Sequence, residues 1–159
     1  MKKIPLTKGK FAILDNEDYG HINIFNWKLS TEGYAVTTFQ TNTNKRKSVG
    51  MHRLILNPFT EFVIDHINGD PLDNRKKNLR ICLPKENTFN RKKSKGKTSV
   101  YKGVGFYKRT GQWQARITFE GKLIHLGMFS TPESASMAYD RAAKKFFGKF
   151  AWKKNRSPQ

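Results

Sequence analysis

Every second residue from Trp113 to Phe119 is apolar, and the residues between them are polar. On a strand, this alternation gives an apolar face and a polar face on opposite sides of a sheet. A tight turn at 120–122 sends the chain back antiparallel through 123–129, and a helix follows the cap residue Thr131. Together with a strand in the glycine-punctuated stretch before Trp113, three strands and one helix are predicted to share one apolar layer. The helix contributes a stripe at helical spacing, namely Ala135, Ala138, Tyr139, Ala142 and Phe146.

The N-terminal half is predicted to consist of short strands and turns, with a helix at its end. Residues 16–20 (NEDYG) are interpreted as a turn, and residues 21–30 alternate roughly like a strand. The dipeptide Asn68-Gly69 is a hairpin signal that closes a strand over 61–67. Pro84 suits the first turn of a helix. Further strands are expected at 10–15, 32–40 and 78–84, with a polar tip at 41–48 and an apolar run at 49–56. The predicted fold class is therefore α+β.

The charge balance indicates the class of partner. The chain of 159 residues has 31 Lys and Arg against 12 Asp and Glu, a formal net charge of +19 that attracts nucleic acids. A membrane surface is the alternative, but it requires a basic amphipathic helix or a lipidation signal, and the sequence has neither. We see no transmembrane run and no secretory signal, and the single Cys82 fits a reducing, intracellular compartment. Residues 91–98 are expected to be a basic linker, either solvated or in contact with phosphates.

The pair Asp65-His66 stands at the end of an apolar run, directly before a turn rich in Gly, Asp, Pro and Asn. Phosphodiester hydrolysis needs a base that takes a proton from water and a charge that stabilises the leaving oxygen. Histidine suits the first task because its pKa lies near neutrality, and a divalent cation on a carboxylate suits the second. Adjacent strand residues point to opposite faces, so the pair serves one site only where the strand ends and twists.

A second metal ligand would come from another element. The helix from Pro84 offers Asn87 and Asn90, which are three apart and share one helical face. The asparagines of the turn also have an ordinary interpretation, because residues such as Asn74 and Asn78 typically form local hydrogen bonds in turns. The residues alone leave both readings open.

The run MHRLILNP…VIDHINGDPLDNRKKNLRICLPKENTFN, residues 51–90, resembles the HNH endonucleases of the phage and intron-encoded homing type. The resemblance implies a two-stranded ribbon and a helix around one divalent metal. It implies His66 as the general base, with Asp65 and Asn87 as metal ligands. The final position is Asn where many members have His, which favours Mg²⁺ or Mn²⁺ over Zn²⁺. By the same resemblance Asn78 supports the site through hydrogen bonds in the loop, and scaffold or phosphate contacts are expected from His52 and Arg53. Asn74 is also expected to support the site, and Asn90 to make a scaffold or phosphate contact.

The C-terminal run YKGV…GQWQARITFEGKLIHLGMFSTPESASMAYDRAAKKFFGKFA resembles the AP2 DNA-binding domain. The resemblance implies that the sheet lies in the DNA major groove and that the helix supports it from behind. Several arginines of the plant members are Gly105, Tyr107 and Thr118 here, so the DNA target does not carry over and phosphate contact is favoured over base contact. The DNA face would carry Lys102, Tyr107, Arg109, Gln114, Arg116, Thr118 and His125.

The sequence therefore predicts a metal-dependent DNA endonuclease, by resemblance a homing endonuclease, that acts on double-stranded DNA without a small-molecule cofactor. The nuclease domain is expected at 1–90, with a β-rich part at 1–50 to which no chemistry is assigned, and the AP2-like domain at 99–155. The location implied is the cytoplasm of a bacterial host if the gene is phage-encoded. The alternative is a non-catalytic DNA-binding regulator with a decayed nuclease, and an RNA-binding protein is disfavoured because no RNP-type aromatic motif is present.

Overall fold

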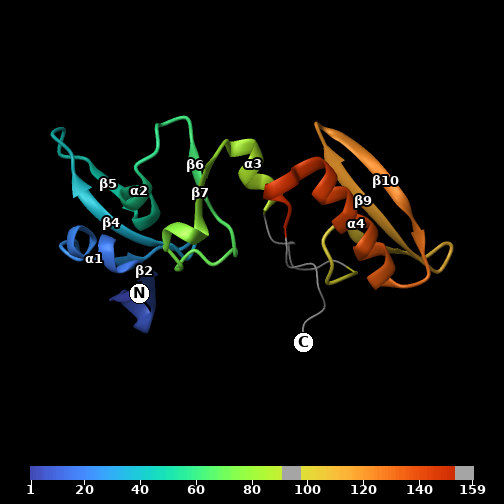
Figure 1. Cartoon of the computed structure of the whole chain (residues 1–159), viewed down its shortest axis with the longest axis horizontal. Helices are drawn as coiled ribbons and strands as arrows, with labels where there is room; N and C mark the ends of the chain where they lie inside the picture. The colour runs from blue at the N-terminus through green and yellow to red at the C-terminus, as the bar shows by residue number, and fades with distance from the viewer. Residues whose placement is uncertain (91–97, 153–159) are drawn as a thin grey trace. The chain divides into compact units, whose positions relative to one another are not determined.

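The computed structural model describes residues 1–90 and 98–152, and the chain forms two compact units that divide after Asn87. The first unit contains a two-stranded sheet, a three-stranded sheet in the order β3-β4-β5, and a separate two-stranded ribbon (Figure 1). Its strands are β1 (Lys2–Pro5), β2 (Phe11–Leu14), β3 (Lys28–Leu29), β4 (Ala35–Gln40), β5 (Arg46–Gly50), β6 (Val63–His66) and β7 (Leu79–Cys82). Its helical segments are η1 (Thr7–Gly9), α1 (Asn16–Ile22), α2 (Met51–Leu56), η2 (Lys76–Asn78) and the start of α3 (Pro84–Phe89).

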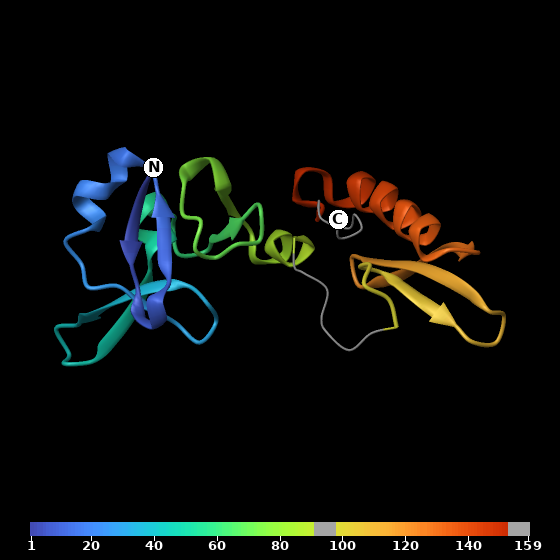
Figure 2. The same cartoon turned by 90° about the horizontal axis from the view of Figure 1, so that it is seen from below.

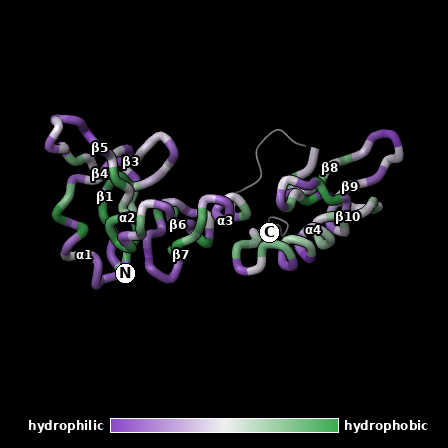
Figure 3. Tube along the Cα trace, turned by 90° about the horizontal axis from the view of Figure 1, so that it is seen from above, coloured by the Kyte–Doolittle hydropathy of each residue, from purple (hydrophilic) through white to green (hydrophobic). Residues whose placement is uncertain are grey.

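One apolar core holds the first unit together. Alternate residues of β2 point into it, with Ala12 and Leu14 fully buried, and Met51 at the start of α2 closes it from another side. The tip between β4 and β5 is hydrophilic, as expected from the sequence (Figure 3). The other buried members of this core are Ile4, Leu6, Ile22, Trp27 and Ala35.

Two predictions for residues 16–30 are wrong. The expected turn at 16–20 is the first part of α1, whose acidic first turn suits the positive end of the helix dipole and whose Ile22 is buried in the core. The expected strand over 21–30 shrinks to β3, because His21 and Ile22 complete α1. The Trp27 indole N–H donates to the Ile22 carbonyl at 2.8 Å and fixes the loop between them. Burial on one helical face therefore outweighed the turn preference of Gly20.

The second unit is the predicted sheet of three antiparallel strands with one helix, and this result confirms the α+β class. The strand order is β10-β9-β8, and α4 covers one face of the sheet (Figure 2). Glu120 and Gly121 form the two-residue turn between β9 and β10, and both have positive φ, 50° and 76°. The Thr131 hydroxyl accepts a hydrogen bond from the Ser134 amide at 3.2 Å and caps α4. The elements are β8 (Val104–Tyr107), β9 (Gln112–Phe119), β10 (Lys122–Phe129), α4 (Pro132–Phe147) and η3 (Gly148–Phe150).

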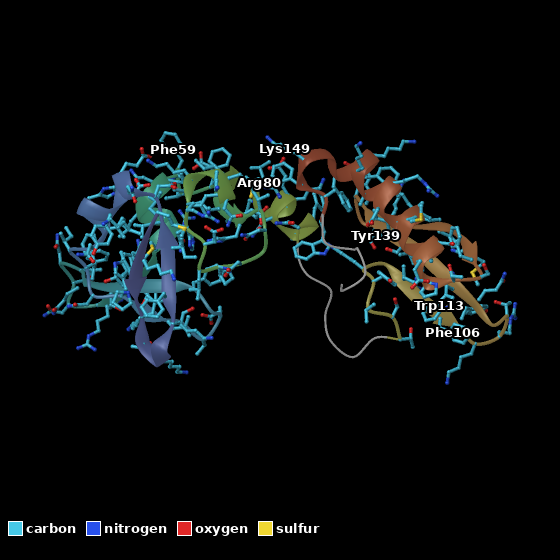
Figure 4. All side chains as sticks on the ribbon, turned by 60° about the horizontal axis from the view of Figure 1, so that its bottom comes forward. Phe59, Arg80, Phe106, Trp113, Tyr139 and Lys149 are labelled. Carbon is cyan, nitrogen blue, oxygen red and sulfur yellow. The ribbon has the colours of Figure 1, made fainter. Side chains whose placement is uncertain are left out.

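The apolar face of β9 packs on α4, as its alternation predicts. Ala115 is buried against Ala135 and Ala138, and Ile117 against Tyr139. Next to this core, the Phe106 and Trp113 rings lie opposite each other on β8 and β9, with centroids 5.1 Å apart (Figure 4).

Gly103 is required where the chain enters β8. Its φ is +72°, and a Cβ at this position would lie 2.0 Å from Cδ2 of Tyr139 and 2.5 Å from the carbonyl oxygen of Arg116. The Gly103 carbonyl accepts a hydrogen bond from the Arg116 amide at 2.8 Å. The glycine therefore allows the chain before β8 to lie directly between α4 and β9.

The remaining sequence predictions concern parts of the chain that the structure describes only in part. The linker at 91–98 lies outside the described residues except for Thr98, as do residues 153–155 of the expected C-terminal domain. Within residues 1–90 and 98–152, none of the helices combines the length and the apolarity needed to cross a bilayer.

Candidate active site

Asp65 and His66 end the strand β6, which pairs antiparallel with β7. Asp65 lies opposite Arg80 and His66 lies opposite Leu79. Both residues of the pair are buried, with exposed fractions of 5% and 6%. Their side chains have different neighbours, because the carboxylate of Asp65 meets Arg80 whereas the ring of His66 meets Asn74 and the ring of His52.

The connection from β6 to β7 is a long loop, residues 67–78, so the predicted tight hairpin at Asn68-Gly69 is wrong. These two residues only begin the loop. The Gly69 amide donates to the His66 carbonyl at 2.8 Å, and Gly69 has a φ of 69°. The Asn-Gly signal correctly marks a turn but does not set the length of the connection.

Asn78 joins the two ends of this loop. Its Oδ1 accepts from the Asn68 amide at 2.9 Å, and its Nδ2 donates to the Asp73 carbonyl at 2.7 Å. The Asp73 carboxylate receives two hydrogen bonds from Arg75, at 2.7 and 2.6 Å, and one from the Asn68 side chain at 2.9 Å. The hydrogen bonds from Arg75 hold the pKa of Asp73 below its usual value. The loop that follows His66 is therefore held by its own buried polar groups.

The strand β2 supports the same loop from outside. The Ile13 amide donates to the Leu72 carbonyl at 2.8 Å, and the Ile13 carbonyl accepts from the Asn74 amide at 2.7 Å. Asp15 accepts from the Lys76 amide at 2.8 Å. The sequence assigned no role to residues 1–50, and the structure shows that their second strand positions the loop next to His66.

The side chains of Asn74, His52 and Tyr34 contact the ring of His66. Its Nε2 lies 3.4 Å from Oδ1 of Asn74, whose Nδ2 donates to the Leu72 carbonyl at 3.2 Å. The centroid of the His52 ring is 5.2 Å away at 83°, and that of Tyr34 is 5.8 Å away. Burial lowers the pKa of His66, and the Asn74 contact and nearby carboxylates oppose this effect in part. At neutral pH the ring is therefore an uncharged imidazole, which is the form that can accept a proton.

His52 and Arg53, the two residues after Met51 in α2, contact neighbouring segments of the first unit. Burial, followed by the charges of His66 and Arg53, lowers the pKa of His52 to about 4. Its Nδ1 is buried without a hydrogen-bond partner among the described residues. The Arg53 guanidinium donates to the Phe62 carbonyl at 2.7 Å and ties α2 to the segment before β6.

The candidate metal ligands have contrasting environments. Arg80 on β7 (Figure 4) donates from Nε to Oδ2 of Asp65 at 2.7 Å, and its Nη2 contacts the same oxygen. Asn87 is exposed on α3, and its amide N–H donates to the Leu83 carbonyl at 3.2 Å. Asn90, three residues later, is buried. The carboxylate and the Asn87 amide are both hard oxygen donors, which fit a hard divalent cation. Among the described residues, no three His, Cys, Asp or Glu side chains are grouped to hold a metal.

The polar face of the second unit carries most of the predicted DNA-contacting residues. Arg116 and His125 lie opposite each other on β9 and β10, both exposed, and Nε2 of Gln114 is 3.1 Å from Nδ1 of His125. Lys102 differs, because it lies before β8 and its ammonium donates to the Phe89 carbonyl at 2.8 Å. The other exposed residues of the predicted set are Tyr107, Arg109 and Thr118, with the guanidinium of Arg109 5.9 Å from the Tyr107 ring centroid.

Comparison with known proteins indicates the family of the first unit. A family model described as HNH endonuclease matches residues 50–88. Protein 3.8 of Escherichia phage T7 is 38% identical over 90 residues, which cover 57% of this chain and 74% of that protein. The chain belongs to the HNH endonuclease family. Uncharacterized HNH endonuclease L560 of Acanthamoeba polyphaga mimivirus is 27% identical to this HNH endonuclease over 150 residues, 91% of the chain and 74% of that protein. The enzyme is therefore a DNA endonuclease.

The C-terminal part of this HNH endonuclease is homologous to AP2 proteins. The AP2-like ethylene-responsive transcription factor TOE2 of Arabidopsis thaliana is 50% identical over 58 residues, 36% of this chain but 12% of that protein. APETALA2-like protein 2 of Oryza sativa subsp. indica is 48% identical over 58 residues, 13% of its length. The homology thus covers one domain of the plant factors and implies DNA binding for that domain. No solved structure matches the chain.

Four neighbours of the site were not predicted from the sequence. Tyr34 and Arg80 come from different elements and carried no local signal. Asp73 and Asn68 lie within the Asp/Asn-rich loop, so their composition marked a turn but did not indicate the network that they form with Asn78.

Proposed function

We propose that this HNH endonuclease is metal-dependent, cuts double-stranded DNA, and acts as a homing endonuclease with His66 as its general base. The observation that carries the proposal is the buried position of His66 at the end of β6, within the segment matched by the family model. Burial lowers the pKa of this ring, which favours the form that accepts a proton. We assign the nuclease to residues 1–90, the AP2-like DNA reader to 99–155, and the linker to 91–98.

The contacts of His66 favour one tautomer. An amide oxygen only accepts hydrogen bonds, so the contact with Oδ1 of Asn74 puts the ring proton on Nε2 and the lone pair on Nδ1. Nδ1 is then the atom that takes a proton from the attacking water. Tyr34 and His52 pack against the ring and fix its plane, and Asn78 and Asn74 hold the loop beside it. In this mechanism the products carry a 5′-phosphate and a 3′-hydroxyl.

Asp65 and Asn87 would hold one Mg²⁺ or Mn²⁺ through oxygen atoms. When bound, a divalent cation supplies positive charge that stabilises the leaving oxygen. The donor chemistry supports a hard ion, because Mg²⁺ in proteins keeps several waters and uses one or two carboxylates. The buried carboxylate of Asp65 and the exposed amide of Asn87 are consistent with this set.

The second unit would bind duplex DNA through the polar face of its sheet. Arg116 lies near the middle of β9, and its exposed side chain faces away from the residues that pack on α4. We assign it a phosphate contact, because several arginines of the plant members are Gly105, Tyr107 and Thr118 here. A phosphate contact contributes affinity without sequence preference.

Cleavage of supercoiled plasmid tests the nuclease assignment. His66→Ala should lower the rate about 10²- to 10⁴-fold, the usual contribution of a general base, with DNA affinity nearly unchanged. His21→Ala is the matched control, because His21 is exposed at the end of α1 in the same unit. Near wild-type cleavage by His66→Ala would refute the base, and undiminished cleavage in EDTA would refute the metal. A homing enzyme should also cut the allele that lacks its own gene.

A further inference from the structure

We propose that Arg80 and a divalent metal compete for the carboxylate of Asp65, so that the metal binds there only by displacing the guanidinium. This inference rests on the proposed role of Asp65 as a metal ligand. It assigns to Arg80 a positioning role, because metal binding at Asp65 would release the Arg80 side chain from its ion pair.

The geometry supports an exchange. Asp65 and Arg80 are directly opposite in the β6–β7 ladder, so the backbone holds their side chains at the same level. Nε and Nη2 of Arg80 both converge on Oδ2 of Asp65. The side chains are 6% and 14% exposed, so the pair is largely removed from water.

The energetics explain why the carboxylate needs a partner at all times. A buried carboxylate without a counter-charge is strongly destabilising, and removing one member of a buried ion pair leaves such a charge. A divalent cation and a guanidinium both neutralise the carboxylate, but the two cations also repel each other at short range. Binding of the metal at Asp65 therefore displaces Arg80, and loss of the metal restores the ion pair.

DNA offers the displaced guanidinium a new partner. Arginine binds phosphate through two parallel hydrogen bonds, and a DNA phosphate is the substrate group brought to this site. Metal and DNA would then bind cooperatively through Arg80, because each makes the other's contact less costly. Without DNA, the affinity of the site for the metal is therefore low, because Arg80 competes for Asp65.

The experiment measures Mn²⁺ affinity of the full-length protein without DNA, by the electron paramagnetic resonance signal of free Mn²⁺. Arg80→Gln should bind Mn²⁺ roughly 10- to 100-fold more tightly than the wild type, the equivalent of one charge-assisted hydrogen-bonded contact. Its melting temperature in EDTA should be lower than that of the wild type, and Mn²⁺ should restore it. The control is Arg46→Gln, which removes an equal charge from an exposed residue of β5 in the same unit, and should leave Mn²⁺ affinity unchanged.

The outcomes separate this inference from the proposed function. Equal or weaker Mn²⁺ binding by Arg80→Gln overturns the exchange, and so does an equal gain in Arg46→Gln, because the effect would then be net charge alone. If no form binds Mn²⁺ and cleavage persists in EDTA, the metal mechanism itself fails and the exchange fails with it. If Arg80→Gln folds only with Mn²⁺, the exchange is supported. If it folds in neither condition, the Arg80→Lys variant is measured instead. Arg80→Lys should bind Mn²⁺ more tightly than the wild type, because lysine cannot make the two-donor contact with Asp65. Equal or weaker binding by Arg80→Lys would overturn the exchange.

Discussion

Gly103→Ala should destabilise the second unit by two separable effects. The first is the backbone, because an L-residue at a φ of +72° has a cost of about 1–2 kcal/mol. The second is the contact of the new methyl group, which would lie 2.0 Å from Tyr139 and 2.5 Å from the carbonyl oxygen of Arg116. Forcing an additional carbon into a packed core costs about 1–3 kcal/mol. The expected total is about 2–5 kcal/mol.

Gly111→Ala is the matched control for the backbone effect. Gly111 has a φ of +66°, and nothing lies within 4 Å of the Cβ that would be added there. It should therefore lose only about 1–2 kcal/mol, in the same unit. The difference between the two variants isolates the contact with Tyr139 and with the backbone of β9.

Native-state hydrogen exchange of peptides from β9 and β10 is the suitable measurement, because it reports the opening free energy of this unit within the full chain. Adding Tyr139→Leu to Gly103→Ala should recover part of the loss, since contacting residues are not additive. Equal losses in the Gly103 and Gly111 variants would refute the argument that Gly103 is needed for close packing. Unchanged exchange in Gly103→Ala would also refute the position of this residue between α4 and β9.

Two further predictions concern pH and DNA. The pKa of His52 is about 4 when folded and 6.5 by reference, so the unfolded chain takes the proton first and stability is lost as pH falls from about 6.5 to 4. The loss should be about 3 kcal/mol, and His52→Phe should flatten the profile measured by urea denaturation at several pH values; a profile as steep as that of the wild type would contradict this account. Arg116→Ala should weaken DNA binding evenly across sequences and lower the salt slope by about one, as measured by competition binding over a salt series. A loss confined to one preferred sequence would instead indicate a base contact, and no change would remove this face from the DNA interface.

The second unit could be predicted almost completely because its signals are local. The alternation over β9, the positive-φ turn after it and the cap at Thr131 each act within a few residues. The same was not true of α1, where the turn-forming residues of 16–20 were overruled by burial of Ile22 in a core assembled from distant segments. Local propensity predicts an element only where tertiary packing agrees with it.

For the candidate site, the sequence indicated candidate residues but not the groups around them. Asp65 and His66 were recognisable because a motif keeps them adjacent. The ion pair of Asp65 depends on the strand register that places Arg80 opposite it. The ring of His66 packs against Tyr34, which lies in the segment before β4. Register and long-range packing are properties of the folded chain, and no spacing rule within a short window encodes them.

The hydrogen bonds between Ile13 and the loop 67–78 limit which segment of this protein can be transferred to another protein. The family match begins at residue 50, yet the loop beside the candidate base is held by a strand that lies before it. A chimera that transplants only residues 50–90 would lose these hydrogen bonds and would leave the carbonyl of Leu72 and the amide of Asn74 without partners. A segment that is transferred with these hydrogen bonds intact, whether by protein engineering or by recombination, must therefore begin upstream of β2.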